Sequence, residues 1–367
     1  MLLSRRSAVS ALSVAALATL AACGSDAGGS ASSSSASGGS SAASGDLAGA
    51  IKGAGATSQQ DAQTAWMNGF MDANSGASVE YAGGGSGAGV TKFTEGAVDF
   101  AGTDSALSAD EITAAGDDVV EVPLYISPIA VAYNVPGFTG STHINLTGEV
   151  IAQIFNGDVT KWNDDAIASL NDGASLPNLD IVPVHRSDES GTSENFAKYL
   201  ADVAPDVWTY EPAKTWPIDG GQSGDGTSGV ISTIEAAEGT IGYADASKVT
   251  DTLGTAAVGS NGSYTAYSAE AAAATVDASQ LSEDANDTQI VYTINHTAAN
   301  AYPIMLVSYL VAHQKYDDAD IAATVKGYFQ YMASAQGQQA AADAAGCAPI
   351  SDDLRSRVTA AIETIGA

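Results

Sequence analysis

Basic residues are scarce in this chain. Its 367 residues include 13 Lys and Arg against 43 Asp and Glu, so the formal net charge is −30. This balance argues against a nucleic-acid-binding protein, which needs a basic surface for the phosphate backbone. It also argues against electrostatic docking on an anionic membrane. Charged residues make up only 15% and hydrophobic residues 45% of the chain, which favours a folded protein, and the length suggests two domains.

Histidine and cysteine are rare too, which limits the chemistry available. The 4 His residues show no metal-ligand spacing, and neither Cys23 nor Cys347 lies in a metal motif. No G-x-S-x-G or S-x-x-K motif is present. His185 could act as a base, but a histidine at the end of a strand is more often structural, and Cys347 is predicted to be a buried free thiol. We therefore expect no catalytic residue, no metal and no cofactor.

The hydrophobic run near the N-terminus is too short to span a bilayer. It extends from Ala8 to Leu20, follows Arg5 and Arg6, and is followed by Ala21, Ala22 and Cys23. This pattern predicts a lipoprotein signal peptide over 1–22 and a lipidated Cys23. An ordinary secretory signal or a short anchor is the alternative, and the arginine pair leaves the general and twin-arginine export routes both open.

A segment of very low complexity follows. Residues 24–45 contain only Gly, Ser, Ala and one Asp, a composition that cannot bury apolar surface and is typical of a flexible tether. We therefore assign 23–45 to the lipidated cysteine and a tether, and we expect the folded part to begin near residue 46. No other segment contains a transmembrane run.

In the folded part, short apolar runs alternate with helical patterns. The runs predict strands at 119–125, 128–133 and 181–184. Ala62, Trp66 and Phe70 recur every four residues and predict one helix face, and a shorter helix is indicated by Ile151, Ile154 and Phe155. Residues 303–365 are helical in pattern. This alternation predicts an α/β architecture with mainly parallel sheets.

Three segments share one design, in which a small, Gly- or hydroxyl-rich turn opens a predicted helix. They cover residues 53–58, 83–89 and 186–192. A helix N-terminus presents unpaired N–H groups and a partial positive charge, so three such turns in one chain indicate a shared anion site. The turns lack the Gly-Lys-Ser/Thr ending of a P-loop and do not complete G-x-G-x-x-G, which argues against nucleotide binding.

Arg186 and Asp104 refine the expected anion. Arg186 is one of three arginines after the signal peptide and follows a predicted strand, at the end where open α/β sheets bind ligands. A guanidinium binds oxyanions through paired hydrogen bonds, although an ion pair with Asp188 or Glu189 is the alternative. Asp104 is either a turn aspartate or an acceptor for an oxyanion that carries a proton. Phosphate carries such a proton at neutral pH, whereas sulfate does not and would be repelled.

Together these motifs resemble those of the phosphate-binding subunit of the phosphate-specific ABC importer. The resemblance runs from about Lys52 to the C-terminus. The matching segments are 53–57, 85–87, 98–104, 154–157, 161–162, 186–193, 216–217, 241–243 and 302–304.

The resemblance implies a set of phosphate ligands. They are Thr57, Ser58 through its backbone, Ser86, Asp104, Arg186, Ser190, Gly191 and Thr192, with Asp188 supporting Arg186. The chain departs from the family after Thr57, where Ser58-Gln59 stands in place of the usual Phe-Pro. Residues 220–229 match only loosely, and we assign them no ligand contact.

The resemblance also implies a fold and a function. The fold is a two-lobed, periplasmic-binding-protein-like α/β fold of type II, with one lobe formed by 46–131 plus 297–367, the other by 132–296, and a hinge between them. The expected function is that of a lipid-anchored, extracytoplasmic and monomeric solute-binding protein. It would capture inorganic phosphate and deliver it to the permease of an ABC importer, with no chemical step, no nucleic acid and no membrane contact except through Cys23.

Three alternatives remain open at this point. A binding protein of the same fold could take sulfate, molybdate or arsenate instead. A secreted phosphate-ester hydrolase is opposed by the lack of a metal cluster and of a nucleophile–base pair. The tether alone would also allow an adhesive or sensory surface protein.

Overall fold

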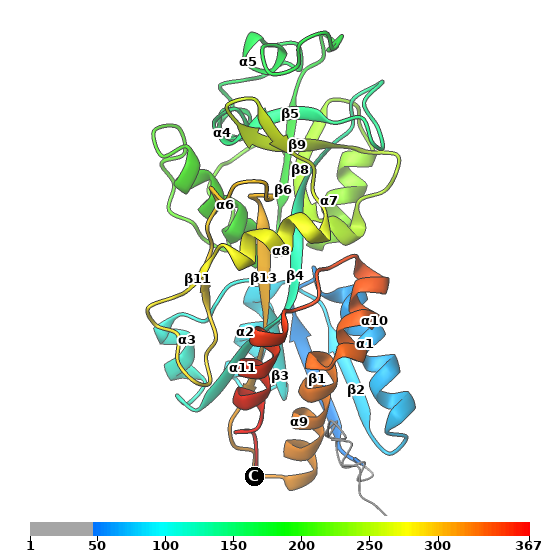
Figure 1. The fold of residues 1–367 in the computed structure, drawn as a ribbon, viewed down its shortest axis with the longest axis vertical. Coiled ribbons are helices and arrows are strands. Elements are labelled where there is room, and N and C mark those ends of the chain that lie inside the picture. The colour runs from blue at the N-terminus through cyan, green and yellow to red at the C-terminus, as the bar shows by residue number, and fades with distance from the viewer. Residues whose placement is uncertain (1–46) are drawn as a thin grey trace, which may run out of the picture. The chain divides into compact units, whose positions relative to one another are not determined.

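Most strands of the protein lie in one large sheet. The structure, a computed structural model, describes residues 47–367, whose strands form an 11-stranded sheet and a separate pair (Figure 1). The strands of the large sheet are β1 (Ala50–Gly55), β2 (Ser78–Ala82), β3 (Phe100–Thr103), β4 (Val119–Tyr133), β5 (Ile144–Thr147), β6 (Val182–Arg186), β7 (Gln222–Gly224), β8 (Thr240–Asp245), β9 (Gly254–Ser260), β10 (Ser263–Thr265) and β13 (Met305–His313). The pair consists of β11 (Gln280–Leu281) and β12 (Tyr292–Thr293).

Helices flank this sheet along most of the chain. They are α1 (Gln60–Ala73), α2 (Ser86–Thr94), α3 (Ala109–Ala114), α4 (Gly148–Asn156), α5 (Asp165–Ala168), α6 (Gly191–Val203), α7 (Gly226–Glu235), the 3-10 turn η1 (Ala246–Lys248), α8 (Ala269–Asp277), α9 (Ala319–Ala333), α10 (Ala335–Ala345) and α11 (Asp352–Ile362). Within residues 47–367, none of them combines the length and apolar character needed to cross a membrane.

One long strand, β4, joins two parts of the sheet. Its residues 119–128 pair with β13, and its residues 129–133 pair with β8. We call β2, β1, β3 and β13 the β13 section, and β8, β6, β7, β9, β5 and β10 the β8 section. All of β4 is buried, so it runs through the core of both sections. In Figure 1 the β8 section lies above the β13 section.

The sheet is mixed, which corrects the prediction of mainly parallel strands. Parallel pairs join β1 to β2 and β3, β6 to β7 and β8, and β5 to β9. In contrast, β13 is antiparallel to both β3 and β4, and β4 is antiparallel to β8 and β9. Strand–helix alternation predicts only neighbours linked by short crossovers. It carries no information about β13, which enters between β3 and β4 from late in the chain.

The pattern of residues 303–365 predicts helices throughout, but the structure has a strand at the start of this part. Met305–His313 forms β13, whereas α9, α10 and α11 do follow. Eight of the nine β13 residues are buried, so both faces of the strand are apolar and its sequence shows no alternation. A continuous apolar run of this kind cannot be told from a buried helix by periodicity.

The other predicted elements are present. The two predicted strands at 119–125 and 128–133 are one strand, β4, and β6 ends on Arg186. The predicted apolar face of α1 is buried, as are Ile151, Ile154 and Phe155 of α4.

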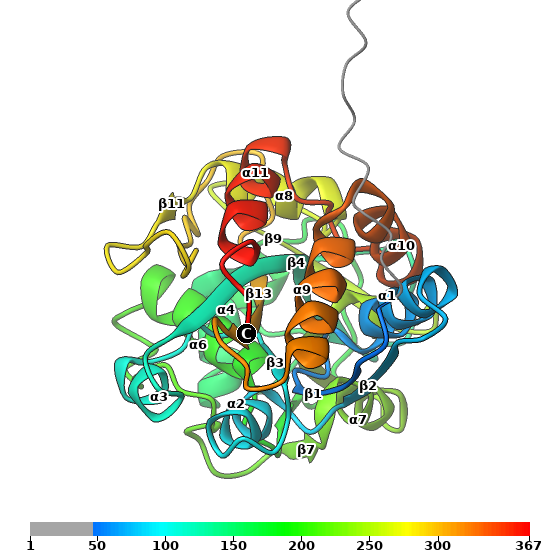
Figure 2. The same ribbon diagram turned by 90° about the horizontal axis from the view of Figure 1, so that it is seen from below.

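The β13 section is covered on both faces. Phe100 of β3 packs in the large core with α1 and α9, whereas its neighbour Ala101 packs with Val90 and Phe93 of α2. The view from below separates α1, α9 and α10 from α2 in the same way (Figure 2). Successive strand side chains point to opposite faces, so this alternation buries the sheet between two helical layers. The Gly85 N–H donates to the Gly55 carbonyl over 3.2 Å, which places the start of α2 beside the end of β1.

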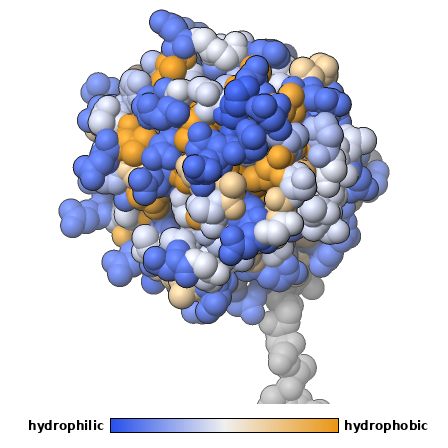
Figure 3. All heavy atoms as spheres, turned by 90° about the horizontal axis from the view of Figure 1, so that it is seen from above, coloured by the Kyte–Doolittle hydropathy of each residue, from blue (hydrophilic) through white to orange (hydrophobic). Residues whose placement is uncertain are grey.

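The end of the β8 section that carries α5 has a polar surface. Seen from that end, hydrophilic residues predominate and hydrophobic residues are scattered (Figure 3). Among the large hydrophobic residues of 47–367, only Leu281 is largely exposed, at 38%.

Candidate functional site

Four helices begin close to one another, two from each section of the sheet. Arg186 Nη2 donates to Thr57 Oγ1 over 3.1 Å, and the Thr227 N–H donates to the same oxygen over 3.1 Å. The Gly87 N–H donates to the Glu189 carbonyl over 3.1 Å. These contacts bring together the loops that precede α1, α2, α6 and α7. Because the first N–H groups of a helix lack acceptors within it, this arrangement suits an anion.

Asp104 accepts hydrogen bonds from elements of both sections of the sheet. It follows β3, and the residue is 2% exposed. Its Oδ1 accepts hydrogen bonds from Ser58 Oγ and Ser308 Oγ, each over 2.6 Å, and its Oδ2 accepts one from Thr192 Oγ1 over 2.8 Å. Each hydroxyl is the donor in these contacts, so the Asp104 carboxylate is the acceptor in all three.

Arg186 is held in place by Asp188. Arg186 is 4% exposed at the end of β6, with Nε donating to Asp188 Oδ1 over 2.7 Å and Nη2 donating to Oδ2. Burial would raise the pKa of Asp188, but the hydrogen bonds and charge of Arg186 and the Gly226 N–H outweigh it, so this pKa lies below its ordinary value. Within residues 47–367, Nη1 of Arg186 makes no hydrogen bond, which leaves it for a ligand.

The start of α6 lies directly against the Asp104 turn. Ser190 caps the helix by accepting the Ser193 N–H over 3.2 Å. At Gly191, a Cβ would lie 2.8 Å from both Asp104 Cβ and Ser86 Oγ, a distance that real side chains do not adopt. The Asp104 N–H in turn donates to Ser86 Oγ over 3.1 Å. Glycine therefore allows the backbone of α6 to approach Asp104 and Ser86.

The predicted ligands thus lie together. Thr57 contacts Arg186, and Ser58 and Thr192 contact Asp104. Ser86 and Gly191 contact the Asp104 turn. Ser190 and Asp188 are neighbours of these residues in the sequence. Their roles as ligands remain a prediction. Cys23 lies outside the described residues.

Sequence reasoning missed several residues that join this cluster. The stretch 220–229 had been assigned no ligand contact, yet Thr227 bonds to Thr57 and the Gly226 N–H donates to Asp188. A signal existed, because Gly226-Thr227-Ser228 opens α7 with the same small, hydroxyl-rich pattern as the other turns. Ser308 carried no such signal, since it lies inside the apolar strand β13.

His185 and Cys347 are held by packing and backbone contacts. Both ring nitrogens of His185 bond to backbone carbonyls, those of Arg186 and Gly220, and the ring stacks on Trp216. Cys347 is a buried free thiol, and burial raises its pKa to about 12. Within residues 47–367, no group of His, Cys, Asp and Glu is arranged to hold a metal ion.

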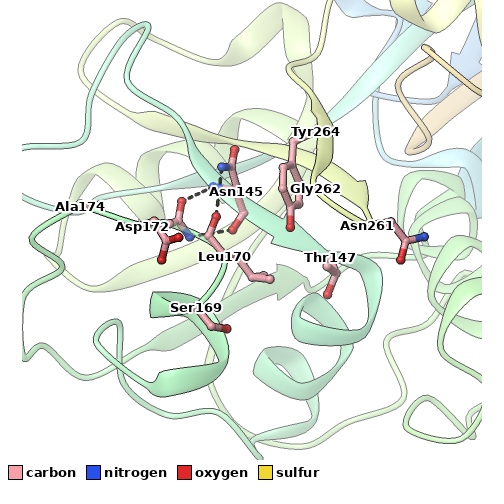
Figure 4. Close-up of a pocket in the computed structure, with 10 residues that line it drawn as sticks. Asn145, Thr147, Ser169, Leu170, Asp172, Ala174, Asn261, Gly262 and Tyr264 are labelled. Carbon is pink, nitrogen blue, oxygen red and sulfur yellow. Dashed lines mark hydrogen bonds between the residues drawn. The ribbon is translucent and has the colours of Figure 1, made fainter.

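Cavities lie both at this cluster and far from it. One of about 140 Å³ is lined by Thr57, Asp188 and Thr227, among others. A larger cavity, of about 670 Å³, lies at the α5 end and contains none of the predicted ligands (Figure 4). Its side-chain amides bond to the backbone, with Asn171 Nδ2 donating to the Asn145 backbone carbonyl over 3.0 Å. A third cavity, of about 290 Å³, is lined by Asp104 and Asn195, among others, so two cavities adjoin the candidate site.

Comparisons with known proteins agree with this architecture. A family model described as a PBP superfamily domain matches residues 39–336. The phosphate-binding protein PstS 3 of Mycobacterium leprae is 33% identical over 357 residues, which cover 95% of each chain. The phosphate-binding protein PstS of Pasteurella multocida is 30% identical, over 81% of this chain and 85% of its own.

A solved structure supports the fold. It is that of a high-affinity periplasmic phosphate-binding protein, PfluDING, bound with phosphate. The likeness has a TM-score of 0.68 at 22% sequence identity and covers 86% of this chain and 93% of the other. This likeness confirms the predicted α/β fold of the periplasmic-binding-protein type. The relatives are binding proteins rather than enzymes, and the chain belongs to the PstS family of phosphate-binding proteins within the PBP superfamily.

Proposed function

We propose that this protein captures inorganic phosphate. The observation that carries the proposal is the Asp104 carboxylate, which accepts three hydroxyl hydrogen bonds beside Arg186 and the helix starts. An ionised carboxylate accepts hydrogen bonds but cannot donate one, so it favours an oxyanion that brings its own proton. Phosphate at neutral pH does so, and sulfate does not. The names of the relatives support the same ligand.

The proposed ligands contact phosphate in three different ways. Arg186 supplies charge through Nη1, Asp104 accepts the proton of the phosphate, and hydroxyl and backbone N–H groups donate to its oxygens. Because the Ser58 hydroxyl is bonded to Asp104, Ser58 would bind through its backbone N–H. The proposed set is Thr57, Ser58, Ser86, Asp104, Arg186, Ser190, Gly191 and Thr192, with Asp188 positioning Arg186.

The proposal includes closure of two lobes around the ion. One lobe comprises 46–131 plus 297–367 and the other 132–296, with a hinge where β4 passes from β13 to β8. The contact between Arg186 and Thr57 joins one residue from each proposed lobe and fits closure at the site. Hinged closure would surround the phosphate with donors from both sides.

The proposed location is the outer face of the cell membrane. Cys23 would carry the lipid, residues 24–45 would act as the tether, and the protein would work as a monomer that hands phosphate to the permease of an ABC importer. Labelling with a radioactive fatty acid tests the anchor. The label should enter the unsubstituted protein and be absent from Cys23→Ala, and an unlabelled unsubstituted protein would overturn the anchor.

Calorimetric titration tests the ligand. The purified protein, freed of carried phosphate, is titrated with phosphate and with sulfate in turn, and sulfate is then tested as a competitor. We expect tight phosphate binding and no measurable competition by sulfate at equal concentration. Competition by sulfate at a similar concentration would contradict the proposal, and so would metal-dependent hydrolysis of a chromogenic phosphate ester.

A further inference from the structure

A chain of buried hydrogen bonds leads from α9 to Asp104. Tyr328 Oη donates to Gln63 Oε1 over 2.8 Å, and Gln63 Nε2 donates to Gln59 Oε1 over 2.9 Å. Gln59 Nε2 then donates to Ser308 Oγ over 2.5 Å, and Ser308 Oγ donates to Asp104 Oδ1 over 2.6 Å. The chain crosses the β13 section through α9, α1 and β13 and ends on the carboxylate.

The direction of this chain is set by its chemistry. Gln59 Nε2 also donates to the Tyr309 carbonyl over 3.3 Å, and because a carbonyl oxygen only accepts, the amide of Gln59 must point its NH₂ toward Ser308. Ser308 Oγ therefore accepts from Gln59. Its own proton can reach Asp104 Oδ1 at 2.6 Å or the Thr103 carbonyl at 3.3 Å, and the shorter contact is to the carboxylate.

Because these side chains are buried, each of their polar atoms needs a hydrogen-bond partner. The five side chains from Tyr328 to Asp104 are all buried, and a buried polar group costs free energy unless it is hydrogen-bonded. If the Gln59 amide were turned over, its oxygen would face Ser308 Oγ. Gln59 and Asp104 would then both need the single hydroxyl proton of Ser308, and one of the two acceptors would lose its hydrogen bond. Such a network favours one set of hydrogen-bond directions, and in this set Asp104 is always the acceptor.

We propose that Gln59 and Ser308 are positioning residues that hold the Asp104 carboxylate as an acceptor toward the bound oxyanion and thereby set the preference for an oxyanion that carries a proton. This inference rests on the proposed function. Neither residue belongs to the proposed ligand set. Ser308 donates to Oδ1 and thereby fixes the orientation of the carboxylate. Without this donor the carboxylate can turn, so the acceptor for the proton of the oxyanion is no longer held in place and the preference over sulfate weakens.

The test compares phosphate and sulfate affinities in two variants. Ser308→Ala removes the donor to Asp104, and Gln59→Met removes the amide that orients Ser308. We expect the ratio of the sulfate to the phosphate dissociation constant, measured by calorimetry, to fall about tenfold in Ser308→Ala, the size of one hydrogen bond to a charged group. It should fall by a smaller factor in Gln59→Met.

Two further variants separate positioning from stability. Gln338 is also buried, but it bonds to the carbonyls of Leu124 and Met332 and has no contact with Asp104. Gln338→Met should lower the thermal unfolding midpoint and leave the ratio unchanged. Ser308→Thr keeps a hydroxyl and should retain most of the ratio.

The outcomes are distinguishable. An unchanged ratio in either folded variant, with only a lower unfolding midpoint, overturns the inference, and Gln59→Met provides this test if Ser308→Ala does not fold. If Gln338→Met lowers the ratio as much, the effect is one of stability and the inference also fails. Failure of the proposed function is read from the unsubstituted protein alone, which would then not prefer phosphate to sulfate.

Discussion

Arg186 is the residue on which charge recognition depends. Its guanidinium is buried, and Asp188 and Thr57 occupy two of its three nitrogens. A planar guanidinium fixed in this way presents its remaining N–H groups in one direction. Because the chain has only 13 Lys and Arg residues, few other cations could replace it.

Arg186→Ala should weaken phosphate binding at least about a hundredfold, because it removes a charge-assisted hydrogen bond and leaves Asp188 unpaired in the site. Calorimetric titration measures the change. Arg355→Ala is the matched control, since Arg355 pairs with Asp352 on the surface and its loss should leave binding unchanged. Near-normal binding by Arg186→Ala would remove Arg186 from the site.

Asp104→Asn should change both selectivity and pH dependence. An amide in place of the carboxylate can donate, so the penalty for sulfate should shrink, while the acceptor for the phosphate proton is weakened. The ratio of sulfate to phosphate dissociation constants should fall about tenfold or more. Titrations at several pH values measure this, and an unchanged pH profile with unchanged sulfate rejection would exclude Asp104 from the role.

Glu121 makes stability depend on pH. It is buried in β4, where its Oε1 accepts the Leu107 N–H over 2.8 Å. Burial, with a smaller contribution from Glu111, raises its pKa from 4.5 to about 8. Between pH 4.5 and about 8, Glu121 has lost its proton in the unfolded chain but keeps it in the folded chain. The free energy of unfolding should therefore fall as pH rises through this window, by at most about 1.4 kcal/mol per pH unit.

Glu121→Gln should flatten this dependence, because glutamine has no proton to lose and can still accept from Leu107. Urea denaturation at pH values from 4.5 to 8 measures the slope in both proteins. Equal slopes would show that Glu121 does not contribute.

At the scale of elements, the site depends on how closely helix starts approach strand ends. The first residue of α6, Gly191, lies against both the Asp104 turn and the first residue of α2, Ser86. In the proposed division these elements belong to different lobes. The packing of α6 against α2 is therefore part of the closed form.

Gly191→Ala should disfavour closure. The added methyl group would lie 2.8 Å from Asp104 Cβ and Ser86 Oγ, and overpacking of this kind costs about 1–3 kcal/mol. Phosphate affinity should fall about tenfold or more, with little change in the unfolding midpoint of the phosphate-free protein. Gly366→Ala, where a methyl group would meet open space, is the control. Unchanged affinity for Gly191→Ala would show that the contact does not limit closure.

The elements themselves were predictable to different degrees. The four-residue spacing of Ala62, Trp66 and Phe70 predicted α1, because one face of this helix is buried and the other is not. The strand β13 was not predicted, because its apolar run is buried on both faces and fits a buried helix as well as a strand. The strand β4 is also buried on both faces, but its many Val and Ile residues favour a strand. Where the two faces of an element are alike, residue type and not periodicity distinguishes a strand from a helix.

At the scale of the whole folded part, two ion pairs connect the proposed lobes beside the site. Lys214 pairs with Glu111 of α3 over 2.7 Å, with side chains 17% and 28% exposed. Lys248 of η1 pairs with Asp61 of α1 over 2.6 Å, with side chains 25% and 30% exposed. Partial burial reduces screening by solvent and salt, so both pairs should favour the closed form.

Lys248→Met and Lys214→Met should each weaken phosphate binding two- to fivefold, about 0.5–1 kcal/mol, at low salt and less at high salt. Calorimetry at two salt concentrations measures both effects. Lys161→Met is the control, because its pair with Asp180 is much more exposed and lies within one proposed lobe. An equal loss in the control, or no loss in either variant, would contradict a role in closure.

The net charge of −30 excludes extended polyanions, which respond to the field of the whole molecule. It does not exclude one small oxyanion. At the candidate site, hydroxyls, backbone N–H groups and Arg186 act over hydrogen-bond distances, where local geometry outweighs the overall field.

The sequence by itself determined the turns that open α1, α2 and α6, the position of Arg186 at a strand end, and the acidic residue after β3. Each is a property of a few consecutive residues, because backbone preference and side-chain chemistry act locally. Only the tertiary structure decided that Thr227 meets Thr57, that Gln59 orients Ser308, and that Ser308 bonds to Asp104. These contacts join residues up to 249 positions apart, and the packing that inserts β13 between β3 and β4 brings Ser308 to Asp104.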